Sequence, residues 1–159
     1  MEFPRRVYTD EEVRRAQDLI SAGYKHRVRI KGSLAFRQKV RSALQLVKTA
    51  GYYDFLRTYI RGIEEVDGLT QLRNADAKIW ANPYAVENPV DAASMFIQKA
   101  CHMREYLELK HYYGGEAEKR SVGKRIEFLK TLKSKSREKD VLAECDRLLN
   151  LWHESSLVY

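Results

Sequence analysis

The chain has 159 residues, 44% of them hydrophobic and 32% charged, with only 8 glycines and 3 prolines, which excludes disordered, collagen-like and low-complexity proteins. Its 29 lysines and arginines outnumber the 22 aspartates and glutamates, so the net charge is +7. This length suits one folded unit, and we expect residues 1–159 to form a single domain. No apolar run approaches the roughly 20 residues of a membrane span, and residues 1–10 lack the apolar middle of a signal peptide, so we expect a cytoplasmic protein without a membrane partner.

The N-terminal part of the chain predicts a helix followed by a strand. Thr9 and Glu12 have the spacing of a capping box, so a helix should begin near Asp10, and Gly23 suits the left-handed residue that closes it. Over residues 24–31, aromatic or aliphatic side chains alternate strictly with cationic ones. This alternation predicts a half-buried strand with a cationic outer face.

Helical stripes follow in the next section of the chain. Ser33 can cap a helix that Gly51 ends, and a second apolar stripe at helical spacing runs from Tyr52 to Val66. The pattern over residues 69–81 is compatible with two short strands and also with a short helix, and both interpretations stay open at this point.

Three more helices are expected in the second half of the chain. Asn88 before Pro89 matches an N-cap followed by proline at the first helical position, so a long helix should run from Pro89 to about Tyr113. Further apolar stripes predict helices over residues 116–133 and 136–152. The sequence therefore predicts a mainly α fold with a small β element, in which five or six helices form one compact domain.

Positive charge is concentrated in two blocks. No acidic residue lies between Asp18 and Asp54, and Glu127 is the only acid within residues 119–137. If the two blocks fold side by side, they create a positive surface that attracts phosphates or an acidic partner, whereas on opposite sides they create only a diffuse field. A solvated, lysine-rich surface of an ordinary helical protein explains the same residues. The candidate basic surface consists of Lys25, Arg27, Arg29, Lys31, Arg37, Arg41, Lys119, Arg120, Lys124, Arg125 and Lys130.

Familiar catalytic and nucleotide-binding motifs are absent from the sequence. The glycines form neither G-x-G-x-x-G nor G-x-x-x-x-G-K, and G-x-S-x-G does not occur. Cys101 and Cys145 belong to no C-x-x-C motif, which is typical of buried free thiols. We therefore expect no cofactor and no metal, and we assign no catalytic residue.

One pattern on the predicted helix 89–113 suggests an ancestry. Gln98 and His102 lie four residues apart, Lys99 follows Gln98, and Glu116 and Glu118 open the next predicted helix. In this order of elements the chain resembles a minimal zincin, an α+β zinc-metallopeptidase fold in which H-E-x-x-H or H-D-x-x-H supplies two ligands and a later helix supplies an acidic third. The resemblance implies the first ligand position for Gln98, the general-base position for Lys99, the second ligand position for His102, and the third for Glu116 or Glu118.

The departures from this motif imply that hydrolysis has been lost. Glutamine is a poor zinc ligand because its carbonyl is neutral, and Lys99 cannot accept a proton from water while it is charged. A simpler interpretation explains the same residues. Gln98 and His102 would then lie at the polar edge of a core helix and bond to neighbouring backbone or carboxylate groups.

Three functions follow from these patterns. We favour a non-catalytic binding or interaction domain with a basic surface, which the zincin resemblance would make a decayed metallopeptidase. The first alternative is a nucleic-acid-binding protein, because Tyr24, Tyr52 and Tyr53 are interleaved with the cations and could stack on bases. The second alternative is a metal-dependent hydrolase that uses His102 with Glu116 or Glu118. An acidic protein or a nucleic acid would be the partner, and the sequence leaves the oligomeric state open.

Overall fold

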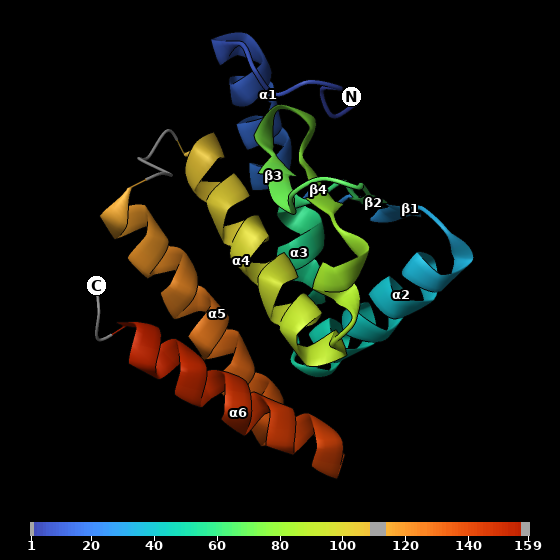
Figure 1. Cartoon of the computed structure of the whole chain (residues 1–159). Helices are drawn as coiled ribbons and strands as arrows, with labels where there is room; N and C mark the ends of the chain where they lie inside the picture. The colour runs from blue at the N-terminus through green and yellow to red at the C-terminus, as the bar shows by residue number, and fades with distance from the viewer. Residues whose placement is uncertain (1, 109–113, 157–159) are drawn as a thin grey trace.

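The computed structural model describes residues 2–108 and 114–156. Within them, six helices pack with a four-stranded sheet, one short 3-10 turn lies between β3 and β4 and a second between β4 and α4, and Figure 1 shows α4 between the sheet and the α5–α6 pair. The mainly α fold with a small β element is therefore confirmed. No helix in these residues is both long enough and apolar enough to cross a membrane. The elements are α1 Asp10–Ser21, β1 Arg29–Lys31, α2 Leu34–Thr49, α3 Tyr53–Tyr59, β2 Gly62–Glu65, β3 Gln71–Arg73, η1 Asn74–Asp76, β4 Lys78–Ala81, η2 Pro83–Val86, α4 Pro89–Leu107, α5 Gly115–Lys135 and α6 Lys139–Ser156.

The predicted caps of the first helices are confirmed. Thr9 Oγ1 accepts a hydrogen bond from the backbone N–H of Glu12 at 3.2 Å, and a Glu12 carboxylate oxygen accepts from the Thr9 N–H at 2.9 Å. Ser33 caps α2 by accepting from the N–H of Phe36 at 3.2 Å. These bonds satisfy N–H groups that a helix start leaves without partners, so residues close in sequence determine where α1 and α2 begin.

The strand predicted over residues 24–31 is wrong in its extent, since β1 contains only residues 29–31. Arg29 pairs with Gly62 in a parallel ladder, so the positions that would face residues 24–28 belong to α3 and the turn after it. A helix cannot pair with a strand, so the ladder does not continue over residues 24–28. The backbone N–H of His26 instead donates a hydrogen bond to the Arg57 carbonyl at 2.7 Å.

The helix predicted from Tyr52 to Val66 is also wrong, because α3 ends at Tyr59 and β2 follows at Gly62. β2 lies between β1 and β4 and is parallel to both. Pairing on both sides satisfies its backbone and buries Ile63, which outweighs the helical spacing of its apolar residues.

The two-strand interpretation of residues 69–81 is confirmed. β3 and β4 pair antiparallel, and Ala77 turns the chain in a left-handed conformation with φ 56°. The sheet order is β1-β2-β4-β3. Ile63 and Ile79 are paired and fully buried, so this face of the sheet lies on the core and the alternate residues form an outer face.

The long helix α4 is the centre of the core. Asn88 caps it by accepting from the N–H groups of Val90 and Asp91, and Pro89 occupies the first helical position as predicted. The helix ends at Leu107, before the predicted end at Tyr113, which lies outside the described residues. Phe96, Ile97 and Ala100 are fully buried because α2, α3 and α5 pack around α4.

The C-terminal helices follow the prediction with shifted ends. α5 starts at Gly115, and α6 starts at Lys139, three residues after the predicted Ser136. Ser136 has an extended backbone and follows the end of α5, while its hydroxyl accepts from the N–H of Glu138. Cys145 and Cys101 are buried free thiols, as expected.

Candidate functional site

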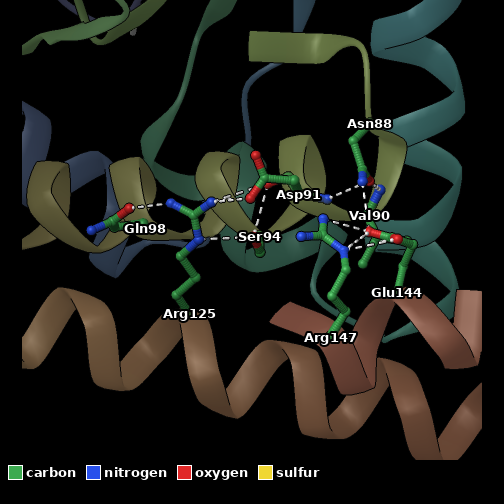
Figure 2. Close-up of polar contacts among 8 residues, drawn as sticks. All are labelled: Asn88, Val90, Asp91, Ser94, Gln98, Arg125, Glu144 and Arg147. Atoms are coloured by element: carbon green, nitrogen blue, oxygen red, sulfur yellow. Dashed lines mark hydrogen bonds and ion pairs between the residues drawn. The ribbon is translucent and has the colours of Figure 1, made fainter. Parts of the chain in front are cut away.

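Gln98, the predicted first metal ligand, makes hydrogen bonds to other side chains inside the core. Gln98 is 6% exposed, and its side-chain oxygen accepts from Arg125 Nη1 at 2.8 Å while its amide donates to Ser121 Oγ at 3.2 Å. Figure 2 shows Gln98 and Arg125 pointing toward one another from α4 and α5. The oxygen that would coordinate a metal therefore faces a guanidinium cation.

Arg125 was expected on the basic surface, and this expectation is wrong. Its side chain is buried at the α4–α5 interface, donating to Asp91 Oδ1 at 2.6 Å and Ser94 Oγ at 2.9 Å, and its guanidinium lies 4.4 Å from the centre of the Trp152 ring. Burial lowers the pKa of Arg125, and the charge of Asp91 opposes this change. The position is internal because Arg125 lies on the face of α5 that packs against α4.

The remaining ligand positions do not assemble a zinc site. Burial lowers the pKa of His102, the nearby Lys99 charge lowers it further, and the Glu118 charge opposes them. His102 Nε2 has no hydrogen-bond partner among the described residues, and Glu116 is exposed on the first turn of α5. Among the side chains that the structure describes, in residues 2–108 and 114–152, no three of His, Cys, Asp or Glu gather at one point. With Arg125 against Gln98 and a lysine beside His102, the residues present do not fit Zn²⁺.

Part of the second basic block is paired with acids of the same chain. Arg120 Nε lies 2.5 Å from Glu105 Oε1, Lys124 Nζ lies 2.9 Å from Glu127 Oε2, and Lys133 pairs with Asp146. Lys119 and Lys130 are exposed on α5. Pairing within the chain therefore neutralises part of this block, while the cations that stay without an acid partner among the described residues, such as Lys119 and Lys130, lie outside the groove described below.

Tyrosines that suggested base stacking are engaged within the fold. The Tyr52 hydroxyl donates to Glu127 at 2.6 Å, and burial together with this bond raises the pKa of Tyr52 to about 12. Tyr24 stacks on Phe3 with ring centres 5.2 Å apart, and Lys48 covers the ring of Tyr53. These rings pack against the protein's own side chains.

The first basic block forms a groove along the sheet, which we name the basic groove. It has a volume of about 740 Å³ and joins β1 with α2 and with the starts of β2 and β4. Gly62 lies between Arg29 and Lys78, its two partners in the sheet. Because glycine has no side chain, nothing fills the bottom of the groove at this position. A Cβ at position 62 would lie 3.1 Å from the Arg29 carbonyl oxygen, so this approach favours glycine. The lining residues are Arg27, Val28, Arg29, Ile30, Lys31, Arg41, Arg61, Gly62, Glu64 and Lys78.

Cations dominate the basic groove, with Glu64 as its only carboxylate among the described residues. Glu64 pairs with Lys78 at 2.9 Å, and Arg61 donates to the backbone carbonyls of Pro4 and Arg5. Four cations remain without a carboxylate within 4 Å in the part of the chain that the structure describes, namely Arg27, Arg29, Lys31 and Arg41.

The groove therefore contains only part of the predicted basic surface. Lys25 and Arg37 are half-buried outside it, and none of the α5 cations lines it. The two charge blocks do not combine there, because α5 packs on the side of α4 away from β1 (Figure 1). Sequence reasoning missed Arg61, because it was assigned to a helix. It also missed Lys78, because this residue lies outside the two charge blocks, in the region 69–81 that was examined only for its secondary structure.

No family model matches this chain, and no match was found among the curated proteins or the solved structures. Its function is therefore inferred from its own residues.

Proposed function

We propose that this protein is a non-catalytic binding domain that holds an anionic partner in the basic groove. The observation that carries the proposal is the set of four cations in the groove that have no carboxylate partner among the described residues. A concave site lined with one sign of charge focuses its field on a ligand. An anion bound there would relieve repulsion among the four cations.

The contrast with α5 supports this proposal against an ordinary solvated surface. On α5, Arg120, Lys124 and Lys133 each have an acid within 3 Å. In the groove, Arg29 and Lys31 are exposed, and the neighbouring Glu64 is taken by Lys78. The two blocks therefore differ in arrangement: the unpaired cations of the first block line one groove, whereas Lys119 and Lys130 lie on the exposed surface of α5 and do not line it.

Charge reversal in the groove tests the proposal. We expect Arg29→Glu with Lys31→Glu to weaken the binding of heparin, used as a model polyanion, at least about tenfold in fluorescence titrations at low salt. The matched control is Lys119→Glu with Lys130→Glu on α5, which changes the net charge equally and should weaken binding only slightly. Equal losses in the two double variants would show that total charge, and not the groove, governs binding.

We also propose that α4 and α5 descend from a metallopeptidase whose site has decayed. The proposal rests on the resemblance and is supported by the side that Gln98 and His102 share on α4, with the Glu118 charge acting on His102. In this interpretation the guanidinium of Arg125 supplies positive charge where the ancestral site held a metal.

Metal analysis follows from the same contacts. We expect protein purified without a histidine tag to contain far less than one equivalent of zinc, and EDTA to leave its Tm unchanged, because a guanidinium contacts Gln98 and Lys99 lies near His102. Elemental analysis and thermal unfolding measure both quantities. Stoichiometric zinc that is lost on His102→Ala would contradict this expectation and favour the metal-dependent hydrolase.

A further inference from the structure

Resting on the proposed function, we infer that the anionic partner is a single-stranded nucleic acid. It lies across the outer face of the sheet, with phosphates on the cations of β1 and its preceding segment and with a base against Trp80. Two structural features carry this inference: a row of cations and an aromatic platform on the same face of the sheet. A single-stranded nucleic acid can use both, because its phosphates bind cations and its unpaired bases stack on aromatic rings.

The row of cations runs from the segment before β1 into the strand itself. Arg27, Arg29 and Lys31 are exposed, whereas Val28 and Ile30 between them are half-buried. Arg29 and Lys31 are alternate residues of β1, so they point to the same side of the sheet about 6 to 7 Å apart, and Arg27 precedes them with the same exposure. A linear polyanion can therefore contact these cations in succession, as phosphates of one strand do along a basic groove.

Trp80 lies on the same face of the sheet as these cations. The register pairs Lys31 with Glu64 and Glu64 with Trp80, so the three residues form one row across β1, β2 and β4. Trp80 is half-buried, and the guanidinium of the exposed Arg73 from β3 lies over its ring, 4.3 Å from the centre, so Trp80 and the planar guanidinium together form the stacking platform. Aromatic rings and arginine planes are the two surfaces on which proteins stack single-stranded bases.

The combination favours single-stranded nucleic acid over other anions. The aspartates and glutamates of an acidic polypeptide would pair with Arg29 and Lys31, but these side chains carry no ring to stack on Trp80. Each nucleotide carries a phosphate and a base together. A duplex keeps its bases stacked inside the helix and presents mainly its phosphates. Unpaired bases use both the cations and the aromatic platform, and their stacking is tolerant of sequence.

Fluorescence of Trp80 tests the inference directly. The chain has two tryptophans, and the partly buried Trp152 packs on Arg125, so Trp152→Phe leaves Trp80 as the only tryptophan reporter. We expect an oligothymidylate of about 12 nucleotides to quench this fluorescence on binding. Poly-glutamate of equal charge, used as the acidic polypeptide, should cause no quenching. The apparent Kd for the oligonucleotide should rise steeply with salt, because phosphate contacts release counterions.

Variants separate stacking from charge. Trp80→Leu should weaken oligothymidylate binding by about tenfold and leave heparin binding unchanged, whereas Arg29→Ala with Lys31→Ala should weaken both. Lys119→Ala with Lys130→Ala is the control for lost charge, and an unchanged Tm verifies that each variant is folded. Anisotropy of a labelled oligonucleotide supplies the oligothymidylate affinities, and the fluorescence titrations described above supply those for heparin.

The outcomes are distinguishable. If heparin or poly-glutamate binds in a way that depends on Arg29 and Lys31, but oligothymidylate neither quenches Trp80 nor loses affinity on Trp80→Leu, the nucleic-acid inference fails and the proposed function stands. Tighter binding of a duplex than of the single strand would also overturn the inference. If the groove variants change the binding of none of these polyanions, both the inference and the proposed function fail.

Discussion

Replacing Arg125 with methionine is expected to lower the free energy of unfolding by about 3 kcal/mol. Methionine fills a similar volume but removes the bonds from Arg125 to Asp91, Ser94 and Gln98, so Gln98 loses a bond inside the core. The loss should stay below the extreme for a broken buried ion pair, because the Asp91 side chain is 38% exposed and can be hydrated. Urea denaturation followed by circular dichroism measures the change.

Two further variants make this test specific. Arg125→Lys keeps the charge but cannot bond to three partners at once, so we expect an intermediate loss. Lys133→Ala removes a cation of α5 whose pair with Asp146 is half exposed, and it should cost less than about 1 kcal/mol. If Arg125→Met costs no more than Lys133→Ala, the buried network does not stabilise the α4–α5 interface.

Acidification from pH 7 to pH 4 is expected to remove up to about 3 kcal/mol of stability through His26 alone. Burial, together with a smaller contribution from the Arg61 charge, lowers the pKa of His26 from 6.5 to about 4. The folded protein therefore keeps His26 neutral where the unfolded chain protonates it. Its contribution is complete above pH 6.5 and declines as the pH falls toward 4.

Comparing the wild type with His26→Phe measures how much of the acid-induced loss of stability comes from His26. Phenylalanine keeps a ring among Phe3 and Tyr24, whose ring centres lie 4.4 and 5.1 Å from that of His26, and it binds no proton. The variant should lose less stability than the wild type between pH 6.5 and pH 4.5, before most carboxylates titrate. His102 contributes in the same direction, so some acid sensitivity should remain. Identical pH profiles for wild type and variant would contradict the assignment.

Local sequence signals predicted the helix starts well. Thr9, Ser33 and Asn88 each bond to N–H groups two or three residues ahead, so the information needed to place these caps lies within one turn of the chain. The apolar stripe from Tyr52 to Val66 misled the prediction, because its second half is stabilised by β1 and β4, which are distant in sequence.

The candidate site was likewise predicted only in part from local sequence signals. The sequence by itself determined the two basic blocks and the cationic alternation of residues 27–31, which depend only on residue order. Only the tertiary structure decided that Arg125 is buried against Asp91 while Arg29 lies open in the groove, because chain packing determines which charges acquire partners. The groove also needs β1, β2, β4 and α2 together, with Gly62 as its floor. No local pattern brings these separated segments side by side, since their pairing is set by long-range backbone hydrogen bonds and core burial.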